Sequence, residues 1–253
     1  MAESLLRAKN AMVFFLADDD ERGTTTWDLL DRCIRTSRAG TDDELAACFI
    51  SLLQDLRDTT KDTGPYTTAM ADWISHSRVE TQADFTRMTP KQRQVMRHHT
   101  VFVRPHVACR IIQRDLATLP PSCESALQDS LILEQTVDLV SLCNDIGSIE
   151  RERPRPGHRQ ELNLIWQEAV TKHVGVDELI DLAIDRYNVK GSAFATTVNQ
   201  LMSQATTAGT PWLAEYAALL KREVNGNLEA HRYLVQQRYP GATHRLQALH
   251  TIP

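Results

Sequence analysis

Apolar residues recur mostly at three- and four-residue steps along this chain, and stretches that alternate apolar with polar residues are isolated. Such spacing places the apolar side chains on one face of a helix, so we expect a nearly all-helical protein. Glycine and proline, the residues that interrupt helices, number only ten each among 253 residues. The expected helices span Ser4–Asp18, Thr26–Arg38, Asp42–Asp58, Tyr66–Ser77, Pro90–Leu116, Ser122–Arg151, His158–Lys172, Val176–Ala205 and Trp212–Gln237.

Local signals indicate where several of these helices begin, bend and end. Thr41 followed by Glu44 at the third position beyond it predicts a capping box before the third helix. Pro105 predicts a bend within the fifth helix. The run RPRPG at positions 153–157 predicts a firm helix end, because two prolines interrupt helical hydrogen bonding there. At 253 residues a single core can bury roughly 70 to 75% of the surface that the unfolded chain exposes, so we expect one domain over residues 1–253.

The composition and the first residues of the sequence indicate the cell compartment and the classes of partner. The 28 basic and 33 acidic residues give a formal net charge of −5, and the basic residues are scattered, so we expect no nucleic-acid partner. Five widely spaced cysteines without a CxxC pair fit reduced thiols. The first residues lack the pattern of a signal peptide, and no apolar run approaches the roughly 20 residues that span a bilayer. We therefore expect a cytoplasmic protein without an integral membrane segment.

A first acidic cluster follows an apolar run near the start, in the sequence FFLADDDE at positions 14–21. Four consecutive acids repel one another by tenths of a kcal/mol per helical pair, and sharing a cation lowers that cost. Carboxylate oxygens are the ligands that magnesium and calcium prefer. The alternative is a solvated helix end at which acidic residues happen to collect.

A second polar cluster follows the apolar residues 137–143. Asn144, Ser148 and Glu152 are spaced i, i+4 and i+8, which places an amide oxygen, a hydroxyl and a carboxylate in one row on a helical face. The row is about 12 Å long at 1.5 Å per residue, and the outer side chains can lean toward the middle. A solvated helix end is the alternative, but polar groups that continue an apolar helix need a partner. The spacing favours a divalent-cation site.

This second cluster resembles the (N/D)DxxSxxxE metal motif of class I terpene synthases (terpene cyclases) of microbial type. Asn144, Asp145, Ser148 and Glu152 match every specified position. The residues ELNLI at positions 161–165 are also similar to the Asn-Leu-Val stretch that begins the next helix in that family. The resemblance implies that Asn144, Ser148 and Glu152 are metal ligands.

The first cluster resembles the family's other metal motif, an aromatic-rich helix that ends in DDxxD or DDxx(D/E). Asp18 and Asp19 match its first two acids, whereas Arg22 occupies the place of the last one. The resemblance implies that Asp18 is a metal ligand with a catalytic role, that Asp19 supports it, and that Phe14 and Phe15 line the substrate pocket. The family's metal motifs thus correspond to positions 18–22 and 144–152.

The family also holds the substrate diphosphate with basic residues. An arginine about four dozen positions before the motif asparagine senses the leaving group and hydrogen-bonds to the aspartate-rich motif, and Arg97 stands at that distance. Arg151 precedes the motif glutamate, as a basic residue does in the family. Arg238 and Tyr239 correspond to a late Arg-Tyr pair, although the sequence has two others, at positions 186–187 and 232–233. The resemblance assigns Arg97, Arg238 and Tyr239 a part in catalysis.

The fold that the resemblance implies is the all-α class I terpenoid synthase bundle, in a single domain. Three Mg²⁺ ions would bridge the two motifs and the diphosphate of an allylic prenyl substrate, so that the C–O bond ionises and the cation cyclises. Farnesyl diphosphate is the expected substrate, with geranyl and geranylgeranyl diphosphate as alternatives. A homodimer is left open.

The resemblance begins early, because Asp18 lies close to Met1 whereas the family has a helix pair before this motif. Either the first helices are lost or the reading frame is truncated. Two further functions stay open: a degenerate helical protein that binds prenyl diphosphate without turnover, and a prenyl diphosphate chain-elongating synthase. The second would carry two aspartate-rich motifs, and this sequence has one.

Overall fold

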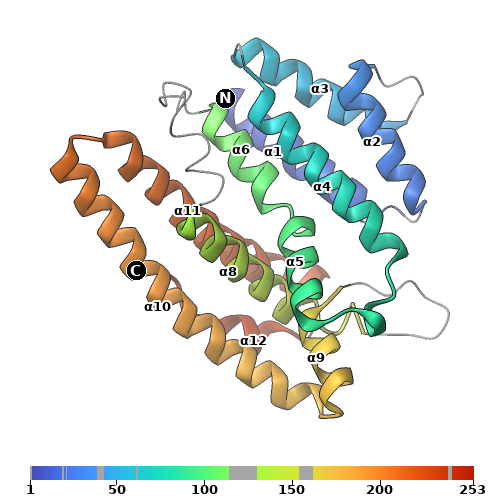
Figure 1. Ribbon diagram of the computed structural model, residues 1–253, viewed down its shortest axis with the longest axis vertical. Coiled ribbons are helices and arrows are strands. Elements are labelled where there is room, and N and C mark those ends of the chain that lie inside the picture. The colour runs from blue at the N-terminus through green and yellow to red at the C-terminus, as the bar shows by residue number, and fades with distance from the viewer. Residues whose placement is uncertain are drawn as a thin grey trace. The chain divides into compact units, whose positions relative to one another are not determined.

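The computed structural model describes residues 2–18, 20, 22–38, 43–60, 62–113, 130–153, 162–238 and 241–253 (Figure 1). Every regular element in these ranges is a helix and none is a strand, which confirms the all-α prediction. The chain divides into two compact units, residues 1–83 with 102–118 and residues 84–101 with 119–253. Among the helices described, none combines the length and the apolar character needed to cross a bilayer.

The first unit consists of helices that pack in pairs. Helix α1 contacts α3 and α6, and α4 contacts α2 and α6. The apolar positions that predicted these helices form one core, which includes Leu30, Phe49, Leu52 and Met70. The helices are α1 (Ala2–Asp18), α2 (Thr24–Thr36), α3 (Glu44–Thr59), α4 (Gly64–Gln82) and α6 (Val103–Gln113).

Aromatic rings from α1, α2, α4 and the residue before α6 meet in the core of the first unit. The ring of Phe14 stacks on Phe102 with 5.0 Å between centroids, and Phe102 meets the edge of Trp73 at 4.7 Å. Trp27 packs edge-on against Trp73 at 5.2 Å. Because Trp73 and Phe102 are 2% and 5% exposed, their place in this structure is the core.

Two local predictions in this region are wrong. The N-cap of α3 is Asp43, whose side chain accepts a hydrogen bond from the Ala46 amide, and Thr41 lies outside the described residues. The long helix expected to bend at Pro105 instead breaks before it, between α5 (Pro90–Thr100) and α6, where Phe102 has φ of 64°. The left-handed backbone conformation costs an aromatic residue about 1–2 kcal/mol of folding free energy, and burial of the Phe102 ring offsets this cost.

The second unit is built around α8 (Leu131–Ser148). This helix packs against α10 and α11 and also contacts α5, α9 and α12, as Figure 1 allows the reader to follow. Burial on most sides explains why apolar residues occur almost all round it. The other elements are η1 (Phe85–Arg87), α5, α9 (Leu164–Lys172), α10 (Val176–Ala208), α11 (Pro211–Arg238) and α12 (Thr243–Gln247).

Several helix ends in this unit differ from the prediction. Helix α8 begins after Ser130, whose hydroxyl caps it, and α9 begins after the N-cap Asn163. Residues 122–129 and 158–161, which we expected to be helical, lie outside the described part of the chain. The short elements η1 and α12 were not predicted, because segments of three and five residues carry too little periodicity.

Side chains of the long helices hold the C-terminal segment. The amide of Asn225 pairs with both backbone groups of Ile252, at 3.0 and 2.9 Å. Asn188 bonds in the same way to the carbonyl of Ala248 and the amide of His250. Arg232 donates to two carbonyls of the segment. These contacts explain an ordered C-terminal segment that periodicity did not indicate.

An ion-pair cluster joins α9 to α10 and makes a test of acid stability. Arg186 donates to both carboxylate oxygens of Glu168, at 2.9 and 3.2 Å, and Lys172 adds a contact at 2.5 Å. The hydrogen bond from Arg186 lowers the pKa of Glu168 to about 2, against the opposing effect of burial. As the pH falls, Glu168 therefore binds a proton in the unfolded chain before it does so in the folded protein. The stabilisation that the ion pairs of Glu168 provide is lost between about pH 4.5 and pH 2.

Glu168→Gln is expected to lower the free energy of unfolding by about 1 kcal/mol at neutral pH, and by progressively less as the pH falls toward 2. Urea unfolding followed by circular dichroism at several pH values measures the difference. Glu215→Gln, on the exposed side of α11, is the matched control. A difference between wild type and Glu168→Gln that stays constant from pH 7 to pH 2 would contradict the assignment.

Candidate functional site

The second polar cluster lies at the C-terminal end of α8. Asn144 and Ser148 belong to the last turns of the helix, which ends at Ser148. The Glu152 amide still donates to the Ser148 carbonyl at 2.9 Å, so the helical hydrogen-bonding pattern extends one turn further. The three residues therefore stand one turn apart, as their spacing predicted.

The oxygens of Asn144 and Ser148 fit a shared hard cation. The Ser148 hydroxyl donates to the Asn144 carbonyl at 2.7 Å, which leaves the hydroxyl lone pairs as acceptors. Ser148 Oγ and Asn144 Oδ1 are 3.4 Å apart, and neighbouring ligands of an octahedral Mg²⁺ ion at 2.0–2.1 Å are about 3 Å apart. Glu152, with 8% of its surface exposed, adds a carboxylate to the row. The donor set is therefore one that Mg²⁺ accepts.

Arg97 of α5 is attached to this motif. Its Nη2 donates to Asn144 Oδ1 at 2.7 Å and lies 2.7 Å from Asp145 Oδ1. Asp145 is completely buried and also accepts a hydrogen bond from the Leu164 amide at 3.1 Å. Burial raises the pKa of Asp145 to about 7, although the neighbouring Arg97 acts in the opposite direction. Asp145 thus joins α5, α8 and the start of α9, and its carboxylate faces the protein.

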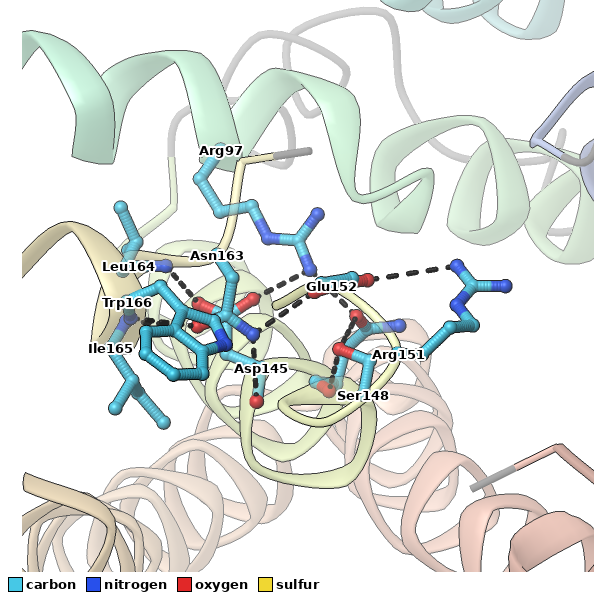
Figure 2. A network of polar contacts seen from close by, with 10 residues as sticks. Arg97, Asp145, Ser148, Arg151, Glu152, Asn163, Leu164, Ile165 and Trp166 are labelled. Atoms are coloured by element: carbon cyan, nitrogen blue, oxygen red, sulfur yellow. Dashed lines mark hydrogen bonds and ion pairs between the residues drawn. The ribbon is translucent and has the colours of Figure 1, made fainter. Parts of the chain in front are cut away.

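The Glu152 carboxylate is oriented by a neighbouring amide. Asn163 Nδ2 donates to Glu152 Oε2 at 3.0 Å and to the Asp145 carbonyl at 2.9 Å. Arg151 Nη2 lies 3.6 Å from the other oxygen, Glu152 Oε1. Figure 2 shows this network, with Arg97 and Arg151 reaching it from different sides. The carboxylate is therefore held by one neutral donor and one cation that is 30% exposed.

Asn163 is the functional residue for which sequence reasoning assigned no role. It is fully buried, and its Oδ1 caps α9 by accepting from the amides of Ile165 and Trp166. Its Nδ2 supports Glu152 at the same time. The signal was present, because an asparagine at a helix start is a preferred N-cap. The second contact depends on α9 packing beside the end of α8, which spacing does not encode.

The two roles of Asn163 can be separated by substitution. Asn163→Ser keeps a capping hydroxyl but is too short to reach Glu152, whereas Asn163→Ala loses both contacts. We expect Asn163→Ala to destabilise the protein by about 1 kcal/mol more than Asn163→Ser, the usual worth of an N-cap. Both variants are expected to weaken Mg²⁺ binding by about 10- to 100-fold, as removal of a group that orients a ligand does. Calorimetric titration with Mg²⁺ measures this, and wild-type affinity in Asn163→Ser would remove Asn163 from the site.

Above about pH 7, where Asp145 is ionised, the charges of the site balance before any ligand is present. Asp145 and Glu152 supply two carboxylates, and Arg97 and Arg151 supply two guanidinium groups. A divalent cation on the row of oxygens would give the site a net positive charge. An anion such as diphosphate would then be attracted to the cation and to the arginines together. The arrangement is suited to cation-dependent binding of an anion.

In the first acidic cluster, Asp20 is the acid whose side chain the structure describes, and it pairs with Arg22. Arg22 Nε lies 2.9 and 2.8 Å from the two oxygens of Asp20, and Arg22 also pairs with Asp43. The hydrogen bond from Arg22 lowers the pKa of Asp20. The guanidinium of Arg22 therefore supplies positive charge to Asp20, one of the acids that we expected to share a metal ion. Asp18 ends α1 with its side chain outside the described residues, and Asp19 lies outside them altogether.

The other predicted site residues fall into two groups. Phe14 and Phe15 are half-buried with their rings 5.3 Å apart, and the role of both in lining a substrate pocket stays a prediction. The side chain of Arg238 and all of Tyr239 lie outside the described residues. Of the other two Arg-Tyr pairs, one has its arginine on Glu168 and the second has its arginine on the C-terminal segment.

Comparisons of the chain with protein-family models, with curated proteins and with solved structures find no match. The resemblance to terpene synthases therefore rests on the motif residues of the sequence. Of the motif residues, those from positions 97 and 144–152 are brought together in one unit by contacts between α5, α8 and the start of α9.

Proposed function

We propose that this protein is a magnesium-dependent terpene cyclase that ionises an allylic prenyl diphosphate, with farnesyl diphosphate as the first substrate to test. The observation that carries the proposal is the row of Asn144, Ser148 and Glu152, with Arg97 hydrogen-bonded to its first member at 2.7 Å. An oxygen-ligand row beside two arginines suits a substrate whose leaving group is a diphosphate.

Each residue of the site has a task in such a reaction. Asn144, Ser148 and Glu152 would hold Mg²⁺, which when bound supplies positive charge to the leaving diphosphate. Arg151 is near enough to the surface to donate to the same phosphate oxygens. Arg97 orients Asn144 and keeps Asp145 paired, and its charge adds to the field that favours departure of the anion. The resemblance adds Asp18 and Asp19 as further ligands and Arg238 and Tyr239 as further diphosphate contacts.

A second candidate function is diphosphate binding without turnover, and one observation favours it. Arg22 stands where the family's first motif has its last acid, and it neutralises Asp20. A first motif with one acid fewer would bind fewer ions, and ionisation depends on the charge that those ions provide. The diphosphate would then be bound at the second motif but would not leave the prenyl group.

The deciding experiment incubates the purified protein with farnesyl, geranyl and geranylgeranyl diphosphate, in Mg²⁺ and in EDTA. Released diphosphate and volatile products are measured together. We expect a cyclic hydrocarbon or alcohol and an equal amount of diphosphate, in Mg²⁺ only. The substrate that reacts fastest defines the chain length.

Two other outcomes have distinct meanings. Mg²⁺-dependent binding of inorganic diphosphate in calorimetry, without release from any substrate, would replace the cyclase proposal by the binding-only function. A longer linear prenyl diphosphate formed after addition of isopentenyl diphosphate would replace it by chain elongation. Absence of both binding and turnover would overturn the magnesium site itself.

A further inference from the structure

A pocket of about 360 Å³ lies within the second unit, among residues of α5, α8, α9 and α10. The residues that line it include the apolar Leu142, Ile165, Leu179 and Ala183. Charged side chains also line it. This volume is in the range of small-molecule sites, and a wall of mixed character suits an amphipathic ligand. Asp145 is among the residues that line it, whereas Asn144, Ser148 and Glu152 are not.

Most charged residues of this wall have a partner of opposite charge. Asp138 pairs with Lys190 at 2.5 Å and with His98 at 2.6 Å. Glu168 pairs with Arg186 and Lys172. The third carboxylate of the wall, Asp145, pairs with Arg97. Each carboxylate that lines the pocket therefore has a cation beside it, and none is left to repel an anionic ligand.

Arg93 of α5 is the exception in this wall. It is 5% exposed, and its guanidinium donates only to neutral acceptors: the Phe85 carbonyl at 3.1 Å, Gln167 Oε1 at 3.4 Å and Thr171 Oγ1 at 3.0 Å. Among the described residues no carboxylate forms an ion pair with it. A buried charge without a counter-charge is costly, because the charged group has lost its water.

Arg93 also has donors left for a ligand. A guanidinium carries five N–H groups, and three of those on Arg93 are accounted for by its three acceptors. The remaining N–H groups belong to Nε and Nη2. Because Arg93 lines the pocket, an anion inside it can supply both the missing acceptors and the missing negative charge.

We propose that this pocket binds an amphipathic organic anion, with its carboxylate or phosphate head on Arg93 and its apolar body along Leu142, Ile165, Leu179 and Ala183. The binding requires no Mg²⁺, because the site uses none of the residues of the oxygen row. The two proposals share the buried Asp145 but differ in their need for Mg²⁺, so a titration in EDTA tests this one independently of the cyclase reaction.

The test is calorimetric titration of the full chain in EDTA with octanoate, octyl phosphate and octanol. We expect saturable binding of one or both anions, and binding of octanol at least about tenfold weaker. The tighter of the two anions identifies the head group as carboxylate or phosphate. Equal binding of octanol and both anions, or no saturable binding of any of them, would overturn the proposal.

Substitutions of Arg93 test whether the anion binds at this residue. Arg93→Met is expected to weaken anion binding at least about tenfold, whereas Arg93→Lys, which keeps the charge, loses less. Arg87→Met makes the same change at an exposed position of η1 and is expected to bind as the wild type does. Wild-type affinity in Arg93→Met would show that Arg93 only joins α5 to its neighbours.

Arg93→Met also removes three hydrogen bonds, so a variant that does not touch Arg93 is needed. Ala183, 1% exposed and in the pocket wall, offers one. Ala183→Leu fills the apolar part of the pocket and is expected to weaken binding of both anions at least about tenfold while Arg93 keeps its contacts. Unchanged binding in Ala183→Leu would place the ligand elsewhere and overturn the proposal, whether or not Arg93→Met folds.

Discussion

Glu152→Gln is expected to reduce Mg²⁺-dependent release of diphosphate at least about 100-fold while leaving the fold intact. The glutamine keeps the size of the side chain, and its amide oxygen can still accept from Asn163 Nδ2, which lies 3.0 Å from Glu152 Oε2 in the wild type. It loses the negative charge, and a neutral amide is a much weaker Mg²⁺ ligand than a carboxylate. Loss of a group that only orients a ligand already costs about 10- to 100-fold, so loss of the ligand charge should cost at least the larger figure.

The matched control for this variant is Glu150→Gln. Glu150 lies two residues earlier and is 49% exposed, and it pairs with Arg245 at 3.1 Å. The two variants make the same chemical change in the same turn, so a general effect of lost charge would appear in both. Assays measure released diphosphate over a Mg²⁺ titration, with circular dichroism to check the fold. A wild-type rate in Glu152→Gln would show that the oxygen row is not the metal site.

At pH 8, where Asp145 with its pKa of about 7 is ionised in the wild type, Arg97→Met is expected to lower the free energy of unfolding by up to about 3–5 kcal/mol. The substitution leaves the fully buried Asp145 carboxylate without the guanidinium that lies 2.7 Å away, and breaking a buried pair from one side has this cost. At about 2–4 °C per kcal/mol for 150 to 250 residues, the melting temperature should fall by roughly 10 °C. Urea unfolding and thermal melting measure the two quantities. Arg87→Met, at an exposed position, serves as the control.

The double variant Arg97→Met with Asp145→Asn separates stability from chemistry. Asparagine at 145 removes the unpaired charge, so most of the lost stability should return, and the difference from additivity measures the coupling of the pair. Turnover should not return, because the double variant still lacks the positive charge beside Asn144. Recovery of activity together with stability would limit Arg97 to a structural role. A loss below about 1 kcal/mol in Arg97→Met alone would contradict the pairing.

The sequence predicted the helical class and most helix positions because amphipathic spacing is a local property. Long helices such as α10 and α11 extend only slightly beyond the expected Val176–Ala205 and Trp212–Gln237. Local signals failed where the sequence offers two neighbouring positions for a helix cap or a helix break. Asp43, not Thr41, caps α3, and the chain breaks at Phe102, not at Pro105. At Phe102, packing of a ring against Phe14 and Trp73 accompanies a backbone conformation that local preference disfavours.

In the candidate site too, the sequence predicted the local arrangement, and the tertiary structure decided the partners. Spacing alone predicted that Asn144, Ser148 and Glu152 form one row, since the row depends only on the helical repeat. The partners of that row come from other elements. Arg97 reaches Asn144 from 47 residues away, and Asn163 reaches Glu152 from the start of α9.

By itself the sequence determined an all-helical chain and a row of oxygen-bearing side chains, because both follow from the period of a helix. Only the tertiary structure decided which charges are paired. It placed Arg22 on Asp20 and Asp43, Arg97 on Asp145, and Arg93 among neutral acceptors. Ion pairing depends on distances of a few ångströms between side chains from separate helices, and no local pattern specifies those distances.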